Sequence, residues 1–300
     1  MVLYESLLIA SQLLLSAYPL LIKLVDASVL FQTGLRMLIY TLLATVAANA
    51  TGTPILLGTL FSYESIYTGL INLLHVGSSY TAFDQLASGN AIALFYTYPI
   101  WNILAAAIYL KETIPISSLP WIGLALLGTI LLAQPSPHNW TVIGVIAALV
   151  AALTETAIYV WFKKDKNDKN EVEEKDKKEE KEPWTKMIQM FGSSGLIWII
   201  GVVALLSLGF LHSKVFRISP NGLISIVVFN ALIGFVGYAL RFYLIPKVST
   251  IVFSALSFVG VVAAYGLGWV FMNEVPTIVQ ALGAVAIIVA NTVLLRREVV

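Results

Sequence analysis

Two ionisable side chains lie within apolar stretches of this sequence, where a charge needs a partner. Arg36 lies in the apolar run Val29–Ala48, and Glu155 lies in the run Thr141–Phe162, one helical turn before Tyr159. An unpaired charge at the centre of a bilayer costs at least about 2.5 kcal/mol. We therefore expect both side chains to face the interior of a helix bundle. Arg36 is suited to a substrate carboxylate or phosphate and Glu155 to a cation or proton, and the alternative is a structural ion pair that the two share.

Polar side chains at helical spacing form a stripe on one face of the segment Tyr63–Ala82. The stripe comprises Thr68, Asn72, His75 and Ser79. The positions 162 residues later hold Asn230, Gly234, Gly237 and Arg241. Small residues let a neighbouring helix or a substrate approach the backbone closely. The two stripes are therefore suited either to line a cavity or to pack helices together, and Arg241, near the inner end of its apolar segment, is expected to snorkel to the membrane interface.

Two tyrosines, Tyr96 and Tyr98, are central in the segment Ser88–Leu110, which favours a cavity lining over the aromatic belt of a membrane interface. Gln12 and Ser16 are one helical turn apart in the first segment and can join this lining. The candidate substrate-binding residues are Gln12, Ser16, Arg36, Asn72, His75, Tyr96, Tyr98, Glu155, Tyr159, Asn230 and Tyr265. Glu155 is also the candidate site for a coupling proton or ion. The sequence contains no pattern typical of an enzyme active site, and we expect no catalytic residue, metal or cofactor.

The elements that must position these residues are membrane-spanning helices. Apolar residues make up 58% of the 300 residues and charged residues only 12%, whereas a soluble domain is about one quarter charged. A helix needs about 20 apolar residues to cross a bilayer. The segments that meet this requirement are Leu3–Ile22, Val29–Ala48, Tyr63–Ala82, Ser88–Leu110, Leu119–Ala133, Thr141–Phe162, Met187–Leu211, Leu223–Ile245, Thr250–Met272 and Ile278–Leu295. We therefore predict an all-α integral membrane protein with about ten transmembrane helices.

A charged segment separates the first six helices from the last four. Lys163–Pro183 is rich in Lys, Glu, Asp and Asn, and Val172 is its one apolar residue. Because such a segment cannot bury a core, we interpret it as a solvated loop. The distribution of Lys and Arg among the loops favours a cytoplasmic position for this loop and for both termini. The predicted divisions are residues 1–162 for helices 1 to 6, 163–183 for the loop and 184–300 for helices 7 to 10.

An internal repeat relates the two halves of the sequence. Ile92–Glu112 and Ser254–Glu274 align without gaps at an offset of 162 residues, and each ends in Glu followed within three residues by Pro. Helices 1 to 5 form the first copy, and the second copy, 141–300, begins with helix 6. Because each copy has an odd number of helices, the two copies enter the membrane from opposite sides. Inverted repeats of this kind are the architecture of many secondary transporters.

Three short motifs lie in the first copy: Leu35-Arg36 in the second helix, Tyr98-Pro99 with Tyr109-Leu110-Lys111-Glu112 in the fourth, and Trp121-Ile122-Gly123 through Gly128 in the fifth. Together they resemble the EamA-like ten-helix proteins of the drug/metabolite transporter superfamily. The second copy departs from the pattern, because Val261 replaces the proline and only Glu274 of the last motif is kept. The resemblance implies a ten-helix fold and transport. It implies no particular substrate, because this superfamily carries amino acids, nucleotide sugars, sugar phosphates and other metabolites.

We interpret the chain as a secondary-active transporter that moves a small organic metabolite by alternating access. The metabolite bears an anionic group in this interpretation, and amino acids or organic acids are favoured over sugar phosphates because few further bases lie at bilayer depth. A channel-like pore and a non-transporting membrane scaffold that uses the charged loop are the alternatives. The expected partners are the small-molecule substrate and the lipid bilayer, with a homodimer left open. The net charge of +1 argues against a nucleic-acid partner.

Overall fold

The computed structural model describes residues 2–50, 52, 57–135, 140–164, 175–272 and 275–298. These described residues form helices and connecting segments and contain no strand. The α-helices are α1 (Val2–Leu15), α2 (Tyr18–Leu24), α3 (Val29–Ala50), α4 (Tyr63–Gln85), α5 (Ser88–Phe95), α6 (Tyr98–Ala105), α7 (Leu119–Ala133), α8 (Val142–Lys163), α9 (Lys175–Ser207), α10 (Pro220–Val228), α11 (Phe235–Leu244), α12 (Thr250–Ser257), α13 (Val259–Met272) and α14 (Ile278–Glu298). Two π-helical segments, η2 (Ala106–Leu110) and η5 (Phe229–Gly234), and four 3-10 turns, η1 (Leu57–Phe61), η3 (Ile116–Ser118), η4 (Ser213–Phe216) and η6 (Ile245–Lys247), complete the helical elements.

Nine segments within the described ranges are long and apolar enough to cross a membrane. The one predicted membrane helix that is not among these nine is α4, the third in chain order. It has 23 residues but is less apolar, because one of its faces carries Thr68, Asn72 and His75. That face is buried against α8 and α9, so its polar groups are kept away from lipid. The prediction of an all-α membrane protein with about ten transmembrane helices is confirmed.

Part of the predicted charged loop lies outside the described residues. Residues 165–174 are not described, and α9 begins at Lys175, inside the segment that the sequence assigned to the loop. Glu274, the last residue of the second repeat motif, also lies outside the described residues. The divisions at residues 162 and 183 therefore stay predictions.

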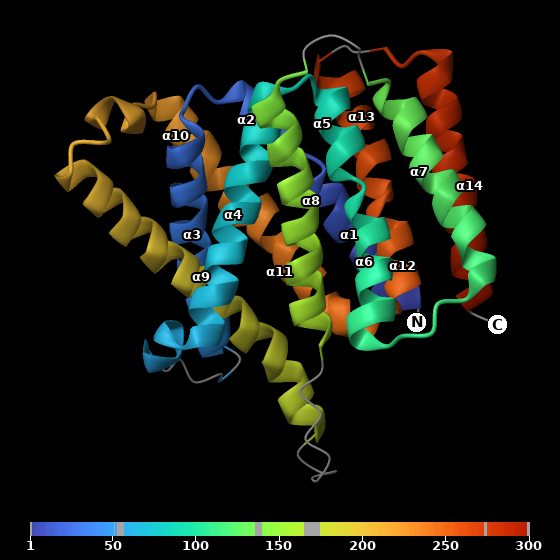
Figure 1. Cartoon of the computed structure of the whole chain (residues 1–300), viewed down its shortest axis with the longest axis horizontal. Coiled ribbons are helices and arrows are strands. Elements are labelled where there is room, and N and C mark those ends of the chain that lie inside the picture. The colour runs from blue at the N-terminus through green and yellow to red at the C-terminus, as the bar shows by residue number, and fades with distance from the viewer. Residues whose placement is uncertain are drawn as a thin grey trace.

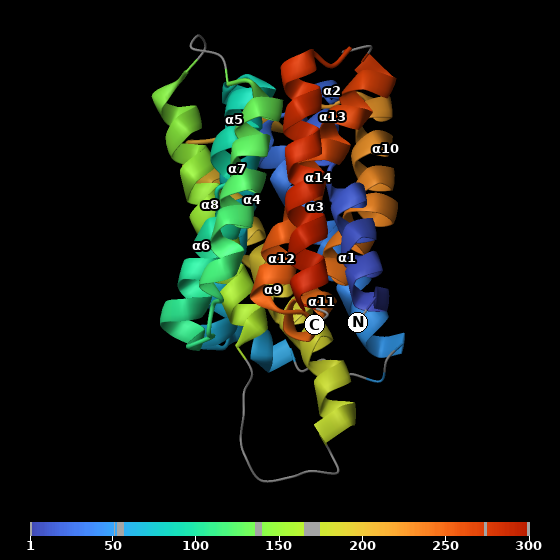
Figure 2. The same ribbon diagram turned by 90° about the vertical axis from the view of Figure 1, so that its right-hand side faces the viewer.

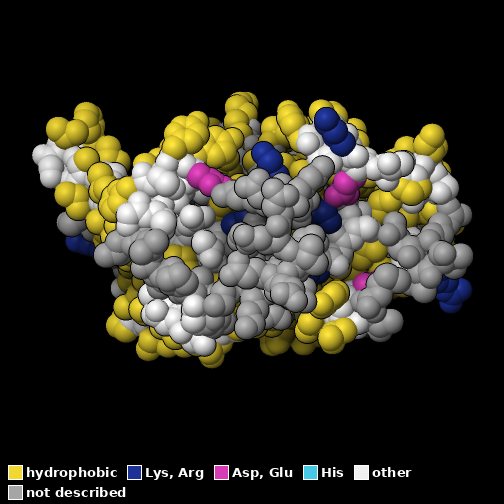
Figure 3. Space-filling model, turned by 90° about the horizontal axis from the view of Figure 1, so that it is seen from below, with side chains coloured by type: hydrophobic (Ala, Val, Ile, Leu, Met, Phe, Trp, Pro, Cys, Tyr) yellow, Lys and Arg dark blue, Asp and Glu magenta, His cyan; other side chains and the backbone are white. Residues whose placement is uncertain are grey.

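The outer faces of the helices are apolar. On α8, the exposed side chains include Val142, Ile146, Leu149 and Leu153, whose spacing of three or four residues places them in one stripe. Figure 3 views the molecule from the end that holds the termini and shows hydrophobic side chains around its periphery, with Lys, Arg, Asp and Glu side chains at this end. The sides of the molecule are therefore suited to contact lipid and its end to contact water.

The two halves run in opposite directions. Both termini, the end of α8 and the start of α9 lie at one end of the molecule (Figures 1 and 2), called here the terminal end. α1 leads away from the terminal end, whereas α8, the first helix of the second half, leads toward it (Figure 1). The last helices of the two halves, α7 and α14, lie side by side (Figures 1 and 2). These directions are the ones that an inverted repeat requires.

Breaks in the fourth and ninth membrane helices follow the same repeat. α5 ends at Phe95 and α12 ends at Ser257, two positions related by the offset of 162 that aligns the sequences. In the first copy, Pro99 follows the break and has no N–H to donate to the carbonyl of Phe95. In the second copy the break is next to Gly260, where a Cβ would lie 2.9 Å from the Tyr96 hydroxyl. The two copies therefore interrupt equivalent helices by different local means, and both breaks adjoin the centre of the bundle.

Candidate functional site

A cavity lies within the bundle where the two broken helices meet the other helices. Its volume, measured as the space open to the centre of a water molecule, is about 60 Å³, enough for several waters or for a small ligand group. Its wall is formed by side chains of α1 to α6, α8, α11 and α13, together with Tyr96, which lies between α5 and α6. The predicted site residues that line it are Gln12, Arg36, His75, Tyr96, Tyr98 and Glu155. Both halves of the chain therefore contribute to one site.

Arg36 projects from α3 into a cage of tyrosine rings. Its guanidinium carbon is 4.5 Å from the ring centre of Tyr238, 4.6 Å from Tyr18, 5.1 Å from Tyr40 and 5.7 Å from Tyr80. Aromatic faces attract a cation by about 2 kcal/mol when both are desolvated, but they do not neutralise it. Among the described residues no carboxylate lies within 4 Å of this guanidinium, and its Nε has no hydrogen-bond partner. Arg36 is only 2% exposed, so its charge is buried without an anion.

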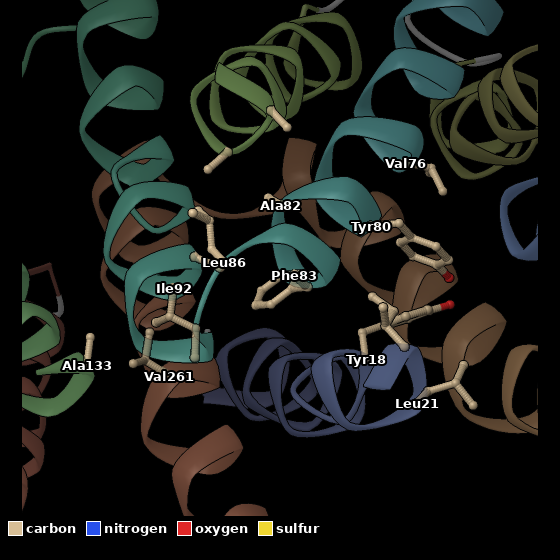
Figure 4. Close-up of a cluster of buried hydrophobic side chains, with 14 of the residues drawn as sticks. Tyr18, Leu21, Val76, Tyr80, Ala82, Phe83, Leu86, Ile92, Ala133 and Val261 are labelled. Atoms are coloured by element: carbon tan, nitrogen blue, oxygen red, sulfur yellow. The ribbon is translucent and has the colours of Figure 1, made fainter. Parts of the chain in front are cut away.

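The tyrosine cage is held in place by the stripe predicted on the eighth membrane helix. The Tyr18 hydroxyl donates to Oδ1 of Asn230 at 2.8 Å and also pairs with the Tyr40 hydroxyl. A Cβ on Gly234 would lie 2.2 Å from the Tyr18 hydroxyl, so glycine leaves the room that the hydroxyl pair occupies. Figure 4 shows Tyr18 beside Tyr80, with both hydroxyls directed to the same side. Asn230 and Gly234 therefore shape the surroundings of Arg36 without lining the cavity themselves.

Glu155 is paired with two groups from other helices. Its Oε1 is 2.5 Å from Nη2 of Arg241, and its Oε2 is 3.3 Å from Nε2 of His75. All three side chains are buried, and a buried carboxylate is tolerated only when it is paired. The expectation that Arg241 snorkels to the interface is wrong, because this side chain is 3% exposed and has its counter-charge inside the bundle. The alternative of an ion pair between Arg36 and Glu155 is also wrong, since Glu155 binds Arg241 instead.

The remaining predicted residues do not line the cavity. They are Ser16, Asn72, Tyr159, Asn230 and Tyr265. The Asn72 amide donates to Oγ of Ser194 at 2.9 Å and so connects α4 with α9. The Tyr159 hydroxyl is 2.6 Å from Oγ1 of Thr250 and connects α8 with α12. Ser16 donates to a carbonyl in its own turn, and Tyr265 packs against the buried hydrophobic cluster.

The sequence analysis named none of the four tyrosines that surround Arg36 as a site residue. Tyr18, Tyr80 and Tyr238 all line the cavity. One signal was present, because Tyr18-Pro19 repeats the Tyr-Pro pair at 98 and 99, and both pairs begin the second part of a broken helix. Tyr238 precedes Arg241 by three residues, which places the two on one helix face.

A pair of aromatic rings joins α8 and α11, the helices that carry Glu155 and Arg241. Phe162 of α8 and Phe242 of α11 stack with ring centres 4.4 Å apart and ring planes 3° apart, and both are buried. Closer to the terminal end, Glu112 accepts a hydrogen bond from Thr250 at 2.5 Å, and its carboxylate is 3.8 Å from Nζ of Lys163. The ring pair links α8 to α11, and these bonds link the end of the fourth membrane helix to α12 and α8.

Comparisons with known proteins bear on the whole chain. A solved crystal structure, described only as that of a protein, aligns with 97% of this chain and 96% of its own chain, with a TM-score of 0.70 and 16% sequence identity. At this identity the likeness establishes the fold alone. No curated protein matches the sequence. The model of the EamA-like transporter family matches residues 2–134 and 185–296, which include nearly all of the membrane helices. The chain therefore belongs to the EamA-like transporter family, a family of membrane transporters of small molecules.

Proposed function

We propose that this protein is a secondary-active transporter that moves a small organic anion by alternating access, with Arg36 as the contact for the anion. The observation that carries the proposal is the buried guanidinium of Arg36 at the cavity wall, which has no carboxylate near it in the described structure. A buried charge without a counter-charge is costly. A substrate anion in the cavity would supply the missing charge.

The charge balance of the cavity favours a substrate with one negative group at this position. Arg241 and Glu155 neutralise each other, so Arg36 is the arginine of the cavity wall that remains for a ligand. A guanidinium holds a carboxylate or phosphate through two parallel hydrogen bonds, but a doubly charged phosphate usually recruits several bases. We therefore place amino acids and related organic acids ahead of sugar phosphates. The walls contributed by Tyr18, Tyr96 and Tyr98 suit a substrate whose remaining part is apolar or aromatic.

Alternating access is supported by the relation between the cavity and the two halves. Inverted repeats commonly place a substrate site at their interface near the bilayer midplane, and here both halves line the cavity. In this proposal, the stacked pair Phe162 and Phe242 closes the cavity toward the terminal end. A channel-like pore would need a continuous polar path, so this closed end favours a carrier over the channel alternative.

A ligand screen on purified protein tests this proposal. Binding to the folded state alone raises the unfolding temperature, so we would measure that temperature in detergent with amino acids, aromatic and aliphatic carboxylates, sugar phosphates and cationic amines. We expect carboxylates to stabilise the wild type and to lose this effect in Arg36→Gln. Arg217→Gln is the matched control, because Arg217 is exposed and does not line the cavity. Stabilisation by neutral or cationic compounds alone would contradict the anion assignment.

A further inference from the structure

Each ring nitrogen of His75 faces an oxygen atom that accepts hydrogen bonds. Nδ1 is 3.1 Å from the carbonyl oxygen of Ala151, and Nε2 is 3.3 Å from Oε2 of Glu155. A carbonyl and an ionised carboxylate have no proton to donate, and a neutral imidazole carries a proton on only one nitrogen. Both contacts of the ring are therefore satisfied together only when His75 is doubly protonated.

The neutral ring has one alternative donor within reach. The Thr154 hydroxyl is 3.4 Å from Nδ1 of His75, but it lies closer to two carbonyl oxygens, at 2.7 Å from Val150 and 3.1 Å from Ala151. A hydroxyl has one hydrogen to donate. When Nδ1 loses its proton, it becomes an acceptor that needs a donor. The Thr154 hydroxyl can be that donor only if it turns from a backbone carbonyl toward the ring. Thr154 gives the site two arrangements, one for each protonation state of His75.

The charged groups near His75 come from three other helices. They are Glu155 of α8, Arg241 of α11 and Arg36 of α3. The hydroxyl-bearing rings that share the cavity wall are Tyr18, Tyr80, Tyr96, Tyr98 and Tyr238. α9 also packs against α4, and there it contributes Ser193 and Ser194. Burial and the two arginines disfavour a proton on His75, and the carboxylate of Glu155 is the nearby charge that favours it.

We propose that His75 is a proton-binding site whose proton is transported together with the substrate anion. The coupling part of this inference rests on the proposed function. A proton on His75 raises the charge of the cavity by one, and an anion with one negative charge lowers it by one, so loading both leaves the charge unchanged. Each then binds more tightly in the presence of the other, and this effect is reciprocal. Glu155, predicted as the coupling group, serves here as the counter-ion that keeps the proton on His75.

The protonation state of His75 can be read without any substrate. The chain has three histidines, so the variant His138→Gln/His212→Gln leaves His75 as its one imidazole. We would record nitrogen-15 NMR spectra of the full chain, labelled at histidine, in lipid nanodiscs between pH 5 and pH 8. We expect both ring nitrogens to be protonated at the acidic end and one at the alkaline end. A ring with a single proton across the whole range would overturn the proton site.

Two further substitutions in that background separate a proton site from a structural histidine. Glu155→Gln removes the counter-charge, so the doubly protonated fraction at pH 6.5 should fall. Thr154→Val removes the alternative donor to Nδ1 with little change of volume, so the same fraction should rise. A fraction that neither substitution changes would contradict the assignment of these two neighbours.

Coupling is tested in proteoliposomes with a carbon-14-labelled mixture of amino acids as the probe. We expect an inward proton gradient to drive accumulation in the wild type. In His75→Gln, the ratio of gradient-driven accumulation to exchange should fall at least about fivefold, the lower end of typical coupling between two sites. An unchanged ratio would overturn the coupling. If the wild type exchanges none of the amino acids, the proposed substrate class is wrong, and the NMR measurement alone decides whether His75 binds a proton.

Discussion

The carboxylate of Glu155 and the guanidinium of Arg241 are 2.5 Å apart, and this ion pair joins α8 to α11 beside the cavity. The stacked rings of Phe162 and Phe242 lie further along the same two helices. The guanidinium of Arg241 is also 4.8 Å from the ring centre of Phe253, so the ion pair contacts a further aromatic side chain. Opening the cavity toward the terminal end would require this contact region to separate.

The first prediction concerns the energy of that pair. Removing one partner of a buried ion pair leaves the other charge uncompensated and costs about 3–5 kcal/mol. Glu155→Gln and Arg241→Gln should therefore each lower the free energy of unfolding strongly. The double variant should be less destabilised than the sum of the two, by about 0.5–3 kcal/mol, because it leaves no lone charge between the two positions. Denaturant unfolding of the purified protein in detergent measures all three values.

A second pair of substitutions is the control for this comparison of single and double variants. Asp84 is exposed at the far end of α4, away from Arg241. Asp84→Asn combined with Arg241→Gln should give a change in unfolding free energy equal to the sum of the two single changes within about 0.5 kcal/mol. Strict additivity for Glu155 and Arg241 as well would show that their contact contributes nothing to stability.

The sequence predicted the helices and the buried polar residues well, because both depend on local composition and spacing. Arg36 and Glu155 were identified from their apolar surroundings, and both line the cavity. The partner of Glu155 was not predictable in this way. Helical spacing tells which face a side chain occupies, but Glu155 and Arg241 are 86 residues apart in sequence, and which helices face each other is decided by the packing of the whole bundle.

The tyrosine cage shows the same limit for aromatic residues. Tyr18, Tyr40 and Tyr238 lie on three different helices, and no spacing rule connects them. In a membrane protein a tyrosine is also common at the lipid interface, so its type alone does not assign it to a cavity. Tyr98 was assigned because it is central in its segment, whereas Tyr18 follows a helix break that the hydropathy pattern does not show.

The second prediction concerns the crossing of α7 and α14. A Cβ on Gly128 would lie 2.7 Å from the carbonyl oxygen of Gly283, and a Cβ on Gly283 would lie 2.6 Å from that of Gly128. Because backbone atoms cannot move aside as a flexible side chain can, Gly128→Ala should lower the free energy of unfolding by about 1–3 kcal/mol. Gly123→Ala on the same helix is the control, because nothing lies within 4 Å of its Cβ position. Equal stability of the two variants would contradict this close helix contact.

The third prediction concerns orientation in the membrane. The chain has no cysteine, so single cysteines can be labelled without background. Lys164 at the end of α8 and Asn221 at the start of α10 are exposed and lie at opposite ends of the molecule (Figure 1). In intact cells, an impermeant thiol reagent should label Asn221→Cys and should label Lys164→Cys only after the membrane is permeabilised. Labelling of Lys164→Cys alone in intact cells would reverse the proposed cytoplasmic position of the terminal end.

The fourth prediction grades the contribution of Arg36 to substrate binding. Loss of a charge-assisted hydrogen bond costs about 1.5–3 kcal/mol, which corresponds to a loss of affinity of about tenfold to a hundredfold. Arg36→Lys keeps the charge but not the two parallel hydrogen bonds, so it should weaken binding less than Arg36→Gln does. Calorimetric titration with the best carboxylate from the ligand screen measures each affinity.

The tyrosine cage around Arg36 allows a second, independent test of this prediction. The ring of Tyr238 is the nearest to the guanidinium, with its centre 4.5 Å from Cζ. Tyr238→Phe keeps the aromatic face and should preserve the orientation of Arg36, whereas Tyr238→Leu removes a cation–π contact worth about 0.5–2 kcal/mol. Carboxylate affinity should therefore fall in Tyr238→Leu and change little in Tyr238→Phe. If Arg36→Gln binds carboxylates as well as the wild type does, Arg36 is a structural residue, and the two Tyr238 variants should then differ in unfolding temperature but not in affinity.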